Sequence, residues 1–217
     1  MIHELIKGNS LFSQFLAELR DKNIQTDSMR FRKNLERVGE IFAYEISKAM
    51  EYEQKEVITS LGTSTMNVLK DRPVLATILR AGMPMHQGLL NFFDSADSAF
   101  VSAYRKYKKN ENFSIKMDYI SSPSITDRIL IISDPMLATG GSMSASIKAL
   151  IQNGVPKHIH IVCLLASEEG IAAIKRSFSL YNYTLWIGAI DDELTAKAYI
   201  VPGLGDAGDL AYGAKLD

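Results

Sequence analysis

The sequence predicts an α/β fold in which helices flank a mostly parallel sheet. Two observations support this prediction. Short apolar runs typical of buried strands alternate along the chain with segments of helical spacing, as in proteins built on parallel sheets. Residues 129–132 are apolar at every position, as in a strand buried on both faces. The 217 residues suffice for one α/β domain with a full core, so we expect a single domain over residues 1–217.

Composition narrows the class of protein. A hydrophobic fraction of 47%, a charged fraction of 23% and a net charge of −1 are ordinary for a globular protein and give no reason to expect a nucleic-acid partner. No apolar run is long enough to cross a bilayer and no signal-peptide pattern is visible, so we expect no membrane partner and a cytoplasmic location. The single cysteine, Cys163, excludes an intrachain disulfide, and its apolar surroundings predict a buried, inert thiol.

The first half of the chain predicts helices, strands and then a hairpin. The helices and strands are expected at residues 9–21, 28–50, 56–61, 74–79 and 83–93. An apolar stripe along residues 28–50 indicates a helix that covers the sheet, and Asp27 or Ser28 suits its N-cap. Residues 99–107 and 113–120 are expected to form a long β-hairpin around a polar, lysine-rich tip.

The second half continues the alternation of strands and helices. After the strand at residues 129–132, the elements are expected at residues 142–152 (helix), 158–166 (strand), 167–178 (helix) and 183–189 (strand). In residues 199–209, four small residues and two acids follow Pro202, so regular helix or strand is not expected there.

The segment after residues 129–132 predicts a phosphate site. Asp134 stands at the carboxyl end of the strand, where open α/β sheets bind their ligands. Residues 137–142 are small and glycine-rich and lead into a helix. Glycines let backbone N–H groups approach a phosphate, the hydroxyls of Thr139 and Ser142 can donate, and the helix dipole favours an anion. The segment lacks both the lysine of an NTP-hydrolysing P-loop and the GxGxxG pattern of dinucleotide sites.

The spacing between Asp134 and Thr139 favours a sugar phosphate as the ligand. The acid precedes the threonine by five residues, so its carboxylate would accept hydrogen bonds from two vicinal hydroxyls while residues 137–142 hold the phosphate. The alternative is a strand-to-helix turn with a capping serine and no ligand.

Three further features concern ligand binding. Arg80 follows the strand at residues 74–79, where a guanidinium suits a diphosphate, although a single arginine is more often a surface or salt-bridged residue. Rigid backbone groups in residues 199–209 would match the alternating C=O, N–H, C=O edge of a planar base, and a flexible tail is the alternative. His158 and His160 share a strand face without an acid or cysteine at ligand spacing, so we expect no protein-held metal.

These motifs together resemble a known family. DPMLATGGS, at residues 134–142, resembles the phosphoribosyl-diphosphate (PRPP) loop of phosphoribosyltransferases, and ILRAG, at residues 78–82, resembles their pyrophosphate loop. The Asp-Pro form of the first motif and YIVPGLGDAGD, at residues 199–209, resemble the uracil phosphoribosyltransferase branch. The stretch from Met29 to Glu45 is similar to the N-terminal helix of that branch, which carries a related RFR…YE pattern.

The resemblance implies a reaction and an architecture. The implied reaction converts uracil and PRPP into UMP and diphosphate, with Mg²⁺ carried by PRPP. The implied architecture is the type I phosphoribosyltransferase fold, with a β-hairpin flap and a C-terminal hood loop over the base. A homo-oligomer, dimer or tetramer, is implied as well, and a GTP effector is left open.

The resemblance also assigns roles to residues. The implied catalytic residues are Arg80, Arg105, Asp134 and Asp206. PRPP would contact Arg80, Arg105, Asp134, Pro135, Met136, Leu137, Ala138, Thr139, Gly140, Gly141, Ser142 and Asp206, and uracil would contact Ile200, Gly205, Asp206 and Ala207.

Two segments depart from the family pattern. Relatives usually carry Glu-Thr-Leu-x-Pro after the second arginine, where this chain has residues 106–112, KYKKNEN. Relatives often continue the tail with a basic residue and then x-Phe-Gly-Thr, where this chain has residues 210–214, LAYGA. Two alternatives therefore stay open: a phosphoribosyltransferase for another nucleobase, and a non-catalytic regulator that senses PRPP or a nucleotide.

Overall fold

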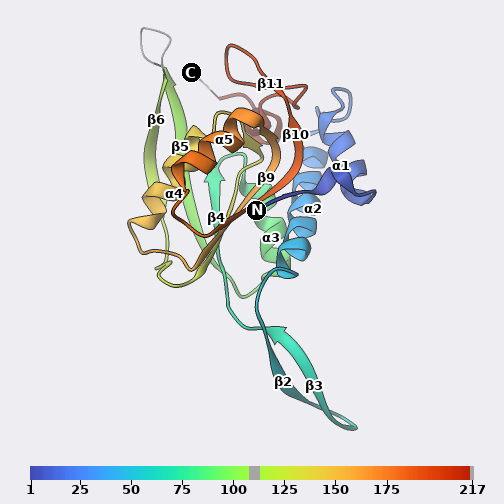
Figure 1. The fold of residues 1–217 in the computed structure, drawn as a ribbon. Coiled ribbons are helices and arrows are strands. Elements are labelled where there is room, and N and C mark those ends of the chain that lie inside the picture. Colours follow the sequence, from blue (N-terminus) through green and yellow to red (C-terminus); the bar gives the residue numbers. More distant parts are fainter. Residues whose placement is uncertain (108–112, 216–217) are drawn as a thin grey trace.

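The structure confirms the predicted α/β class. The computed structural model describes residues 1–107 and 113–215, and within these it describes no side chain of residues 103–117. The strands of the main sheet are β1 (Ile2–Glu4), β4 (Val74–Leu79), β5 (Asp97–Tyr107), β6 (Phe113–Ser121), β7 (Ile129–Ser133), β8 (Met136–Leu137), β9 (His158–Ser167) and β10 (Tyr183–Asp191). Their order is β1-β10-β9-β7-β4-β5-β6, with β8 paired to β9 (Figure 1). Neighbouring strands are parallel, apart from the antiparallel β5–β6 pair.

Helices cover both faces of this sheet. Helices α1 (Leu11–Arg20), α2 (Ser28–Ser47) and α3 (Met83–Phe92) lie on one face, and α4 (Gly141–Ile151) and α5 (Glu168–Ser177) lie on the other (Figure 1). The predicted helices are thus present, with ends shifted by a few residues. Asp27 caps α2, since its carboxylate accepts a hydrogen bond from the amide of Arg30 at 3.0 Å.

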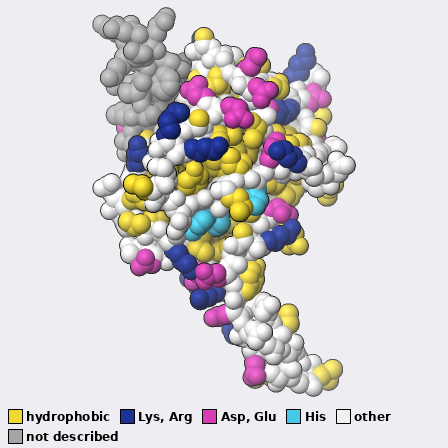
Figure 2. All heavy atoms as spheres, viewed as in Figure 1, with side chains coloured by type: hydrophobic (Ala, Val, Ile, Leu, Met, Phe, Trp, Pro, Cys, Tyr) yellow, Lys and Arg dark blue, Asp and Glu magenta, His cyan; other side chains and the backbone are white. Residues whose placement is uncertain are grey.

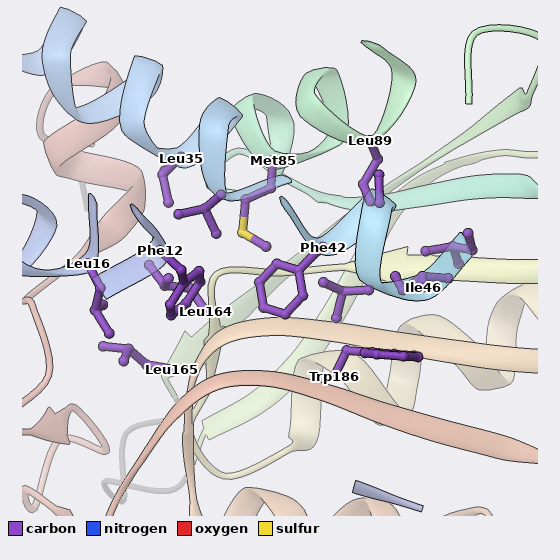
Figure 3. Close-up of a cluster of buried hydrophobic side chains, with 14 of the residues drawn as sticks. Phe12, Leu16, Leu35, Phe42, Ile46, Met85, Leu89, Leu164, Leu165 and Trp186 are labelled. Carbon is purple, nitrogen blue, oxygen red and sulfur yellow. The ribbon is translucent and has the colours of Figure 1, made fainter. Parts of the chain in front are cut away.

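The sheet is buried between two hydrophobic clusters. On the α1–α2–α3 side, Phe42 and Met85 pack toward Leu164 and Trp186 (Figure 3). The opposite cluster contains Ile159, Ile161 and Cys163, alternate residues of β9. Burial, with a smaller contribution from the Asp134 carboxylate, raises the pKa of the Cys163 thiol well above its ordinary value. The prediction of a buried, inert thiol is therefore confirmed.

The prediction of one strand at residues 56–61 is wrong in extent. The chain instead forms a separate two-stranded sheet, β2 (Tyr52–Thr59) and β3 (Gly62–Leu69), which projects from the body of the molecule (Figure 1). The chain reverses at residues 60–61 because the Thr59 hydroxyl accepts from the amides of Leu61 (3.2 Å) and Gly62 (3.1 Å). Apolar side chains stand exposed at the tip of this hairpin (Figure 2), where Ile58 is 87% and Leu61 98% exposed.

The prediction that residues 199–209 form neither helix nor strand is also wrong. Strand β12 (Ile200–Val201) pairs with β11 (Glu193–Leu194), and helix α6 (Ala207–Tyr212) begins inside the segment. The helix starts there because Asp206 is its N-cap, accepting from the amide of Asp209 at 3.0 Å. Among the described residues, four short elements had no sequence prediction: β1, β8, β11 and the 3₁₀ turn η1 (Leu5–Lys7).

Strands β5 and β6 pair as the hairpin pattern predicted, and residues 108–112 of the expected tip lie outside the described part of the chain. Among the helices that the structure describes, none is long and apolar enough to cross a membrane.

Candidate active site

The predicted ligand-binding segments come together at one edge of the sheet. Strands β4 and β7 are parallel neighbours with Thr77 beside Ser133, so both end at the same edge. Arg80 follows β4 and Asp134 follows β7. Ligands of open α/β sheets bind at such carboxyl ends, and residues 137–142 run there from the end of β8 into the start of α4.

The first part of the glycine-rich segment is held against the sheet. The amide of Asp134 donates to the carbonyl of Val162 at 3.1 Å, and the amide of Leu165 donates to the carbonyl of Pro135 at 2.9 Å. Strand β8 then runs beside β9. The Asp134 carboxylate accepts from the amide of Met136 at 3.3 Å. Asp134 and its neighbours are therefore fixed by the sheet before any ligand arrives.

The second part of the segment is supported by the start of α5. The Ser167 hydroxyl donates to the carbonyl of Ala138 at 2.6 Å and accepts from the amide of Gly170 at 3.0 Å. Gly140 has a φ of 75°, and a Cβ added there would lie 2.8 Å from the Cβ of Ala173 and 3.0 Å from the carbonyl oxygen of Gly170. A glycine is thus needed at position 140 for both conformation and space.

Helix α4 points its N-terminus at this segment. Its first intrahelical bond runs from the amide of Ser144 to the carbonyl of Gly140, at 2.9 Å. The amides of residues 141–143 precede that bond and have no partner within the helix, and the helix dipole favours an anion beside them. Thr139 and Ser142 are half-buried. The arrangement is chemically suited to holding a phosphate group.

Arg80 is oriented by the C-terminal segment. Its Nη2 donates to the carboxylate of Asp209 at 3.0 Å and to the carbonyl of Gly213 at 3.3 Å. The Leu79–Arg80 peptide bond is cis. Sequence reasoning identified Arg80 but missed Asp209 and Gly213 as its partners, because 129 and 133 residues separate them from it.

Two of the predicted base-binding residues are buried, and a third is exposed. Ile200 and Ala207 are 4% and 3% exposed and belong to the main hydrophobic cluster, whereas Gly205 is exposed. Ile200 and Ala207 therefore pack into the core, and base contact through backbone groups of this segment stays a prediction.

The surroundings of Asp206 favour its anionic form. Burial acts to raise its pKa, but the amide of Asp209 and the ammonium of Lys215, 3.2 Å away, more than offset burial and lower the pKa below its ordinary value. The same carboxylate is the N-cap of α6. Asp206 thus carries a negative charge at the point where the base-binding segment enters its helix.

A partly buried ion pair holds the start of this segment. Arg20 binds Asp191 in a bidentate manner, with both distances 2.8 Å, and donates to the carbonyl of Gly203 at 3.0 Å. Asp191 also accepts from the amide of Gly203 at 3.0 Å. Sequence reasoning missed both charged residues, although an acid at the end of a strand that precedes the base-binding segment is a usable signal.

Two further features singled out from the sequence are Arg105 and the pair His158 and His160. Arg105 lies in β5, but its side chain is outside the described part of the chain. The rings of His158 and His160 lie 4.6 Å apart, and His160 accepts a hydrogen bond from the Trp186 indole at 3.0 Å. Burial lowers the pKa of His160 to about 3, so this histidine is a neutral core residue. Among the described residues, no group of three or more His, Cys, Asp or Glu side chains is arranged to hold a metal ion.

Fold and edge geometry together define a class. A parallel sheet with an acid, a small-residue segment and a helix N-terminus at its carboxyl edge is typical of α/β proteins that bind phosphorylated small molecules there.

Comparison with known proteins identifies the particular family within this class. The family model described as uracil phosphoribosyltransferase matches residues 6–214. The chain is 57% identical to the uracil phosphoribosyltransferase of Porphyromonas gingivalis over 208 residues, which cover 96% of each chain. It is 42% identical to the uracil phosphoribosyltransferase of Thermococcus gammatolerans, covering 94% of this chain and 89% of that one. The chain is also similar to a solved structure of a protein from Aquifex aeolicus, with 30% identity and a TM-score of 0.87, and the match covers 100% of each chain. The chain belongs to the uracil phosphoribosyltransferase family, as the resemblance predicted.

Proposed function

We propose that this chain transfers the phosphoribosyl group of PRPP to uracil, giving UMP and diphosphate. The observation that carries the proposal is the match of residues 6–214 to the uracil phosphoribosyltransferase family. The geometry at the carboxyl edge supports it, because the segments beside Arg80, Asp134 and Asp206 each offer the groups that one part of the two substrates requires.

PRPP binds with its 5′-phosphate on residues 137–142 and the start of α4. The amides at the helix N-terminus and the hydroxyls of Thr139 and Ser142 are the donors for this phosphate. The Asp134 carboxylate accepts from the two ribose hydroxyls. Since β8, Ser167 and the close packing at Gly140 already fix these groups, little conformational freedom is lost on binding.

Charge on the departing diphosphate is balanced by arginines and Mg²⁺. Arg80 and Arg105 are the guanidinium groups assigned to this role. Mg²⁺ commonly keeps several waters and binds substrate phosphates, so an ion carried by PRPP needs no all-protein cage. When bound, the ion would neutralise diphosphate charge.

Uracil is held by the backbone of Ile200 and of residues 205–207, with Asp206 between base and PRPP. Its N1 forms a bond to C1 of the ribose as the bond from C1 to the diphosphate oxygen breaks, and the N1 proton leaves to solvent. Positioning and charge balance account for the catalysis, so no side chain is assigned as a general base.

Two other functions would use the same fold. A transferase for a different nucleobase shares the PRPP site and would differ in the tail at residues 210–214. A sensor would bind PRPP or a nucleotide without releasing diphosphate. The presence of Arg80, Asp134 and Asp206 and the 57% identity to a uracil phosphoribosyltransferase favour the uracil enzyme over both.

The β2–β3 hairpin supports self-association. Isolated two-stranded hairpins are marginally stable in water, yet this one extends from the body with every residue of β2 exposed. We propose that a second copy of the chain covers it in a homo-oligomer, and that the enzyme works in the cytoplasm.

A GTP effector is a separate question that kinetics with and without GTP answers.

A panel of bases tests the assignment of substrate. Uracil, cytosine, adenine, guanine, hypoxanthine and orotate are each incubated with PRPP, Mg²⁺ and the protein, and nucleotide products are quantified. We expect UMP from uracil and discrimination against cytosine of roughly 10⁴-fold, since a misfitting base leaves buried polar groups unpaired. Comparable turnover of cytosine would contradict backbone recognition of uracil.

A further inference from the structure

Besides its contact with Arg80, the C-terminal segment is held by charged side chains at two further points. Its start is held at Gly203 by Arg20 and Asp191. Its far end is held by Arg32 of α2, whose Nη1 donates to the carbonyl of Ala211 at 2.6 Å. The Arg32 guanidinium also lies over the ring of Tyr212, with Cζ 5.8 Å from the ring centre.

The second attachment is adjacent to the partners of Arg80. Asp209 and Gly213, which accept hydrogen bonds from Arg80, lie on either side of the residues that Arg32 contacts. Tyr212 itself lines a hollow of about 320 Å³ together with Leu79, Arg80 and Met83. The location of the Arg80 guanidinium therefore depends on where the last turn of α6 is held.

We propose that Arg32 is a positioning residue for PRPP. It fixes the end of α6, and the end of α6 orients Arg80 toward the diphosphate. This inference rests on the proposed function, in which Arg80 binds that group. A guanidinium has five N–H donors, so Arg80 can keep Nη2 on the tail and direct its remaining donors at the ligand.

The same helix supplies a matched control. Arg30 precedes Arg32 by two residues on α2 but turns to α1, where its Nε and Nη2 each bind Glu18 at 2.9 Å. Both arginines join α2 to another helix, and only Arg32 contacts the C-terminal segment. A general loss of helix packing would affect both substitutions, whereas the proposed role affects one.

The two attachments also predict which substrate is affected. Gly203, at the start of the base-binding segment, is held by Arg20 and Asp191 independently of Arg32. Loosening the end of α6 should therefore weaken binding of PRPP and leave binding of uracil nearly unchanged. If Arg32 had only a general structural role, its loss would weaken the binding of PRPP and of uracil to a similar extent.

The test compares Arg32→Ala, Arg32→Lys and Arg30→Ala with the unsubstituted protein. PRPP Kd is measured by calorimetry with Mg²⁺, and KM is measured for each substrate. For Arg32→Ala we expect PRPP Kd and KM to rise about tenfold and the uracil KM to change by less than about twofold. Arg32→Lys keeps a donor and a cation near Tyr212, so it should stay within about threefold of the unsubstituted protein. Arg30→Ala should change neither constant.

Several results would overturn the proposal. Unchanged PRPP Kd in Arg32→Ala, equal rises in both KM values, or the same effect in Arg30→Ala would each do so. If Arg32→Ala does not fold, Arg32→Met keeps the apolar stem and replaces it in the comparison. Calorimetry separates this proposal from the proposed function: no UMP from the unsubstituted protein contradicts the function, and an unaltered PRPP Kd contradicts the role of Arg32.

Discussion

At position 140 the backbone adopts a conformation that few residues other than glycine tolerate. Gly140 has a φ of 75° and packs against Gly170 and Ala173. We expect Gly140→Ala to destabilise the fold by about 1–3 kcal/mol and to raise PRPP Kd at least tenfold, because the segment must move to admit the Cβ. Urea unfolding and calorimetry measure the two effects.

Gly8→Ala is the control for that substitution. A Cβ at Gly8 would approach no closer than 4.0 Å to its nearest neighbour, so unfolding and PRPP binding should both stay near those of the unsubstituted protein. Normal PRPP binding by Gly140→Ala would show that the segment at residues 137–142 does not hold the phosphate.

The histidine at position 160 predicts a pH dependence of stability. Burial lowers the pKa of His160 from 6.5 to about 3, so the unfolded chain binds a proton that the folded chain refuses between these values. Stability is therefore present above pH 6.5 and is lost as the pH falls toward 3. The loss amounts to at most about 1.4 kcal/mol per pH unit for this residue.

Replacing His160 should remove the part of the stability loss at low pH that this residue causes. His160→Gln keeps an acceptor for Trp186 and should show a shallower decline in unfolding free energy between pH 6 and pH 4.5, measured by urea titration. His86, whose pKa burial lowers to about 4, still contributes in that variant. An identical decline in both proteins would mean that His160 is not buried as described.

At the scale of elements, the cap of α5 also supports the glycine-rich segment. Ser167 accepts from the amide of Gly170 and donates to the carbonyl of Ala138. We expect Ser167→Ala to cost about 1 kcal/mol of stability, typical of a lost N-cap, and to raise PRPP Kd. Ser10 caps α1 in the same way, accepting from the amide of Phe12, and lies on a helix that the PRPP site does not use.

Ser10→Ala is thus the matched control. It should lose similar stability and bind PRPP normally, with unfolding followed by urea titration and binding by calorimetry. If both substitutions altered PRPP Kd equally, the effect would come from stability alone and the assigned role of Ser167 would be wrong.

Elements with regular patterns were predictable, and those defined by single side-chain contacts were not. The continuous apolar run at residues 129–132 predicts a buried strand, and the apolar stripe along α2 predicts a helix, because burial repeats regularly along each element. Helix α6 is short and depends on Asp206 as its cap, and the β2–β3 turn depends on the Thr59 hydroxyl. At each place, the hydrogen bonds of one polar side chain set a local structure that composition does not predict.

At the scale of the whole molecule, the sequence indicated which segments carry the site but not how they meet. Motifs around Arg80, Asp134 and Asp206 were visible locally. The contact of Arg80 with Asp209 spans 129 residues, and that of Arg20 with Asp191 spans 171. Such contacts depend on the order of strands in the sheet, and periodicity in one segment contains no information about that order.

The projecting hairpin predicts self-association. Replacing Ile58 and Leu61 with lysine should leave the unfolding free energy within about 0.5 kcal/mol, since both side chains are exposed, and should weaken assembly. Sedimentation velocity over a range of concentrations measures this. Leu180→Lys, at a position 96% exposed on the body of the molecule, is the control. Unaltered assembly in the hairpin variant would exclude the hairpin as the contact.

The central claim is that phosphoribosyl transfer to uracil takes place at the carboxyl edge around Arg80. The most direct measurement follows UMP and diphosphate together after mixing the protein with PRPP, Mg²⁺ and uracil, beside Arg80→Gln. We predict one diphosphate released for each UMP formed, and a loss of about 100-fold or more in kcat/KM in the variant. PRPP binding without formation of UMP, or full activity of Arg80→Gln, would contradict the account.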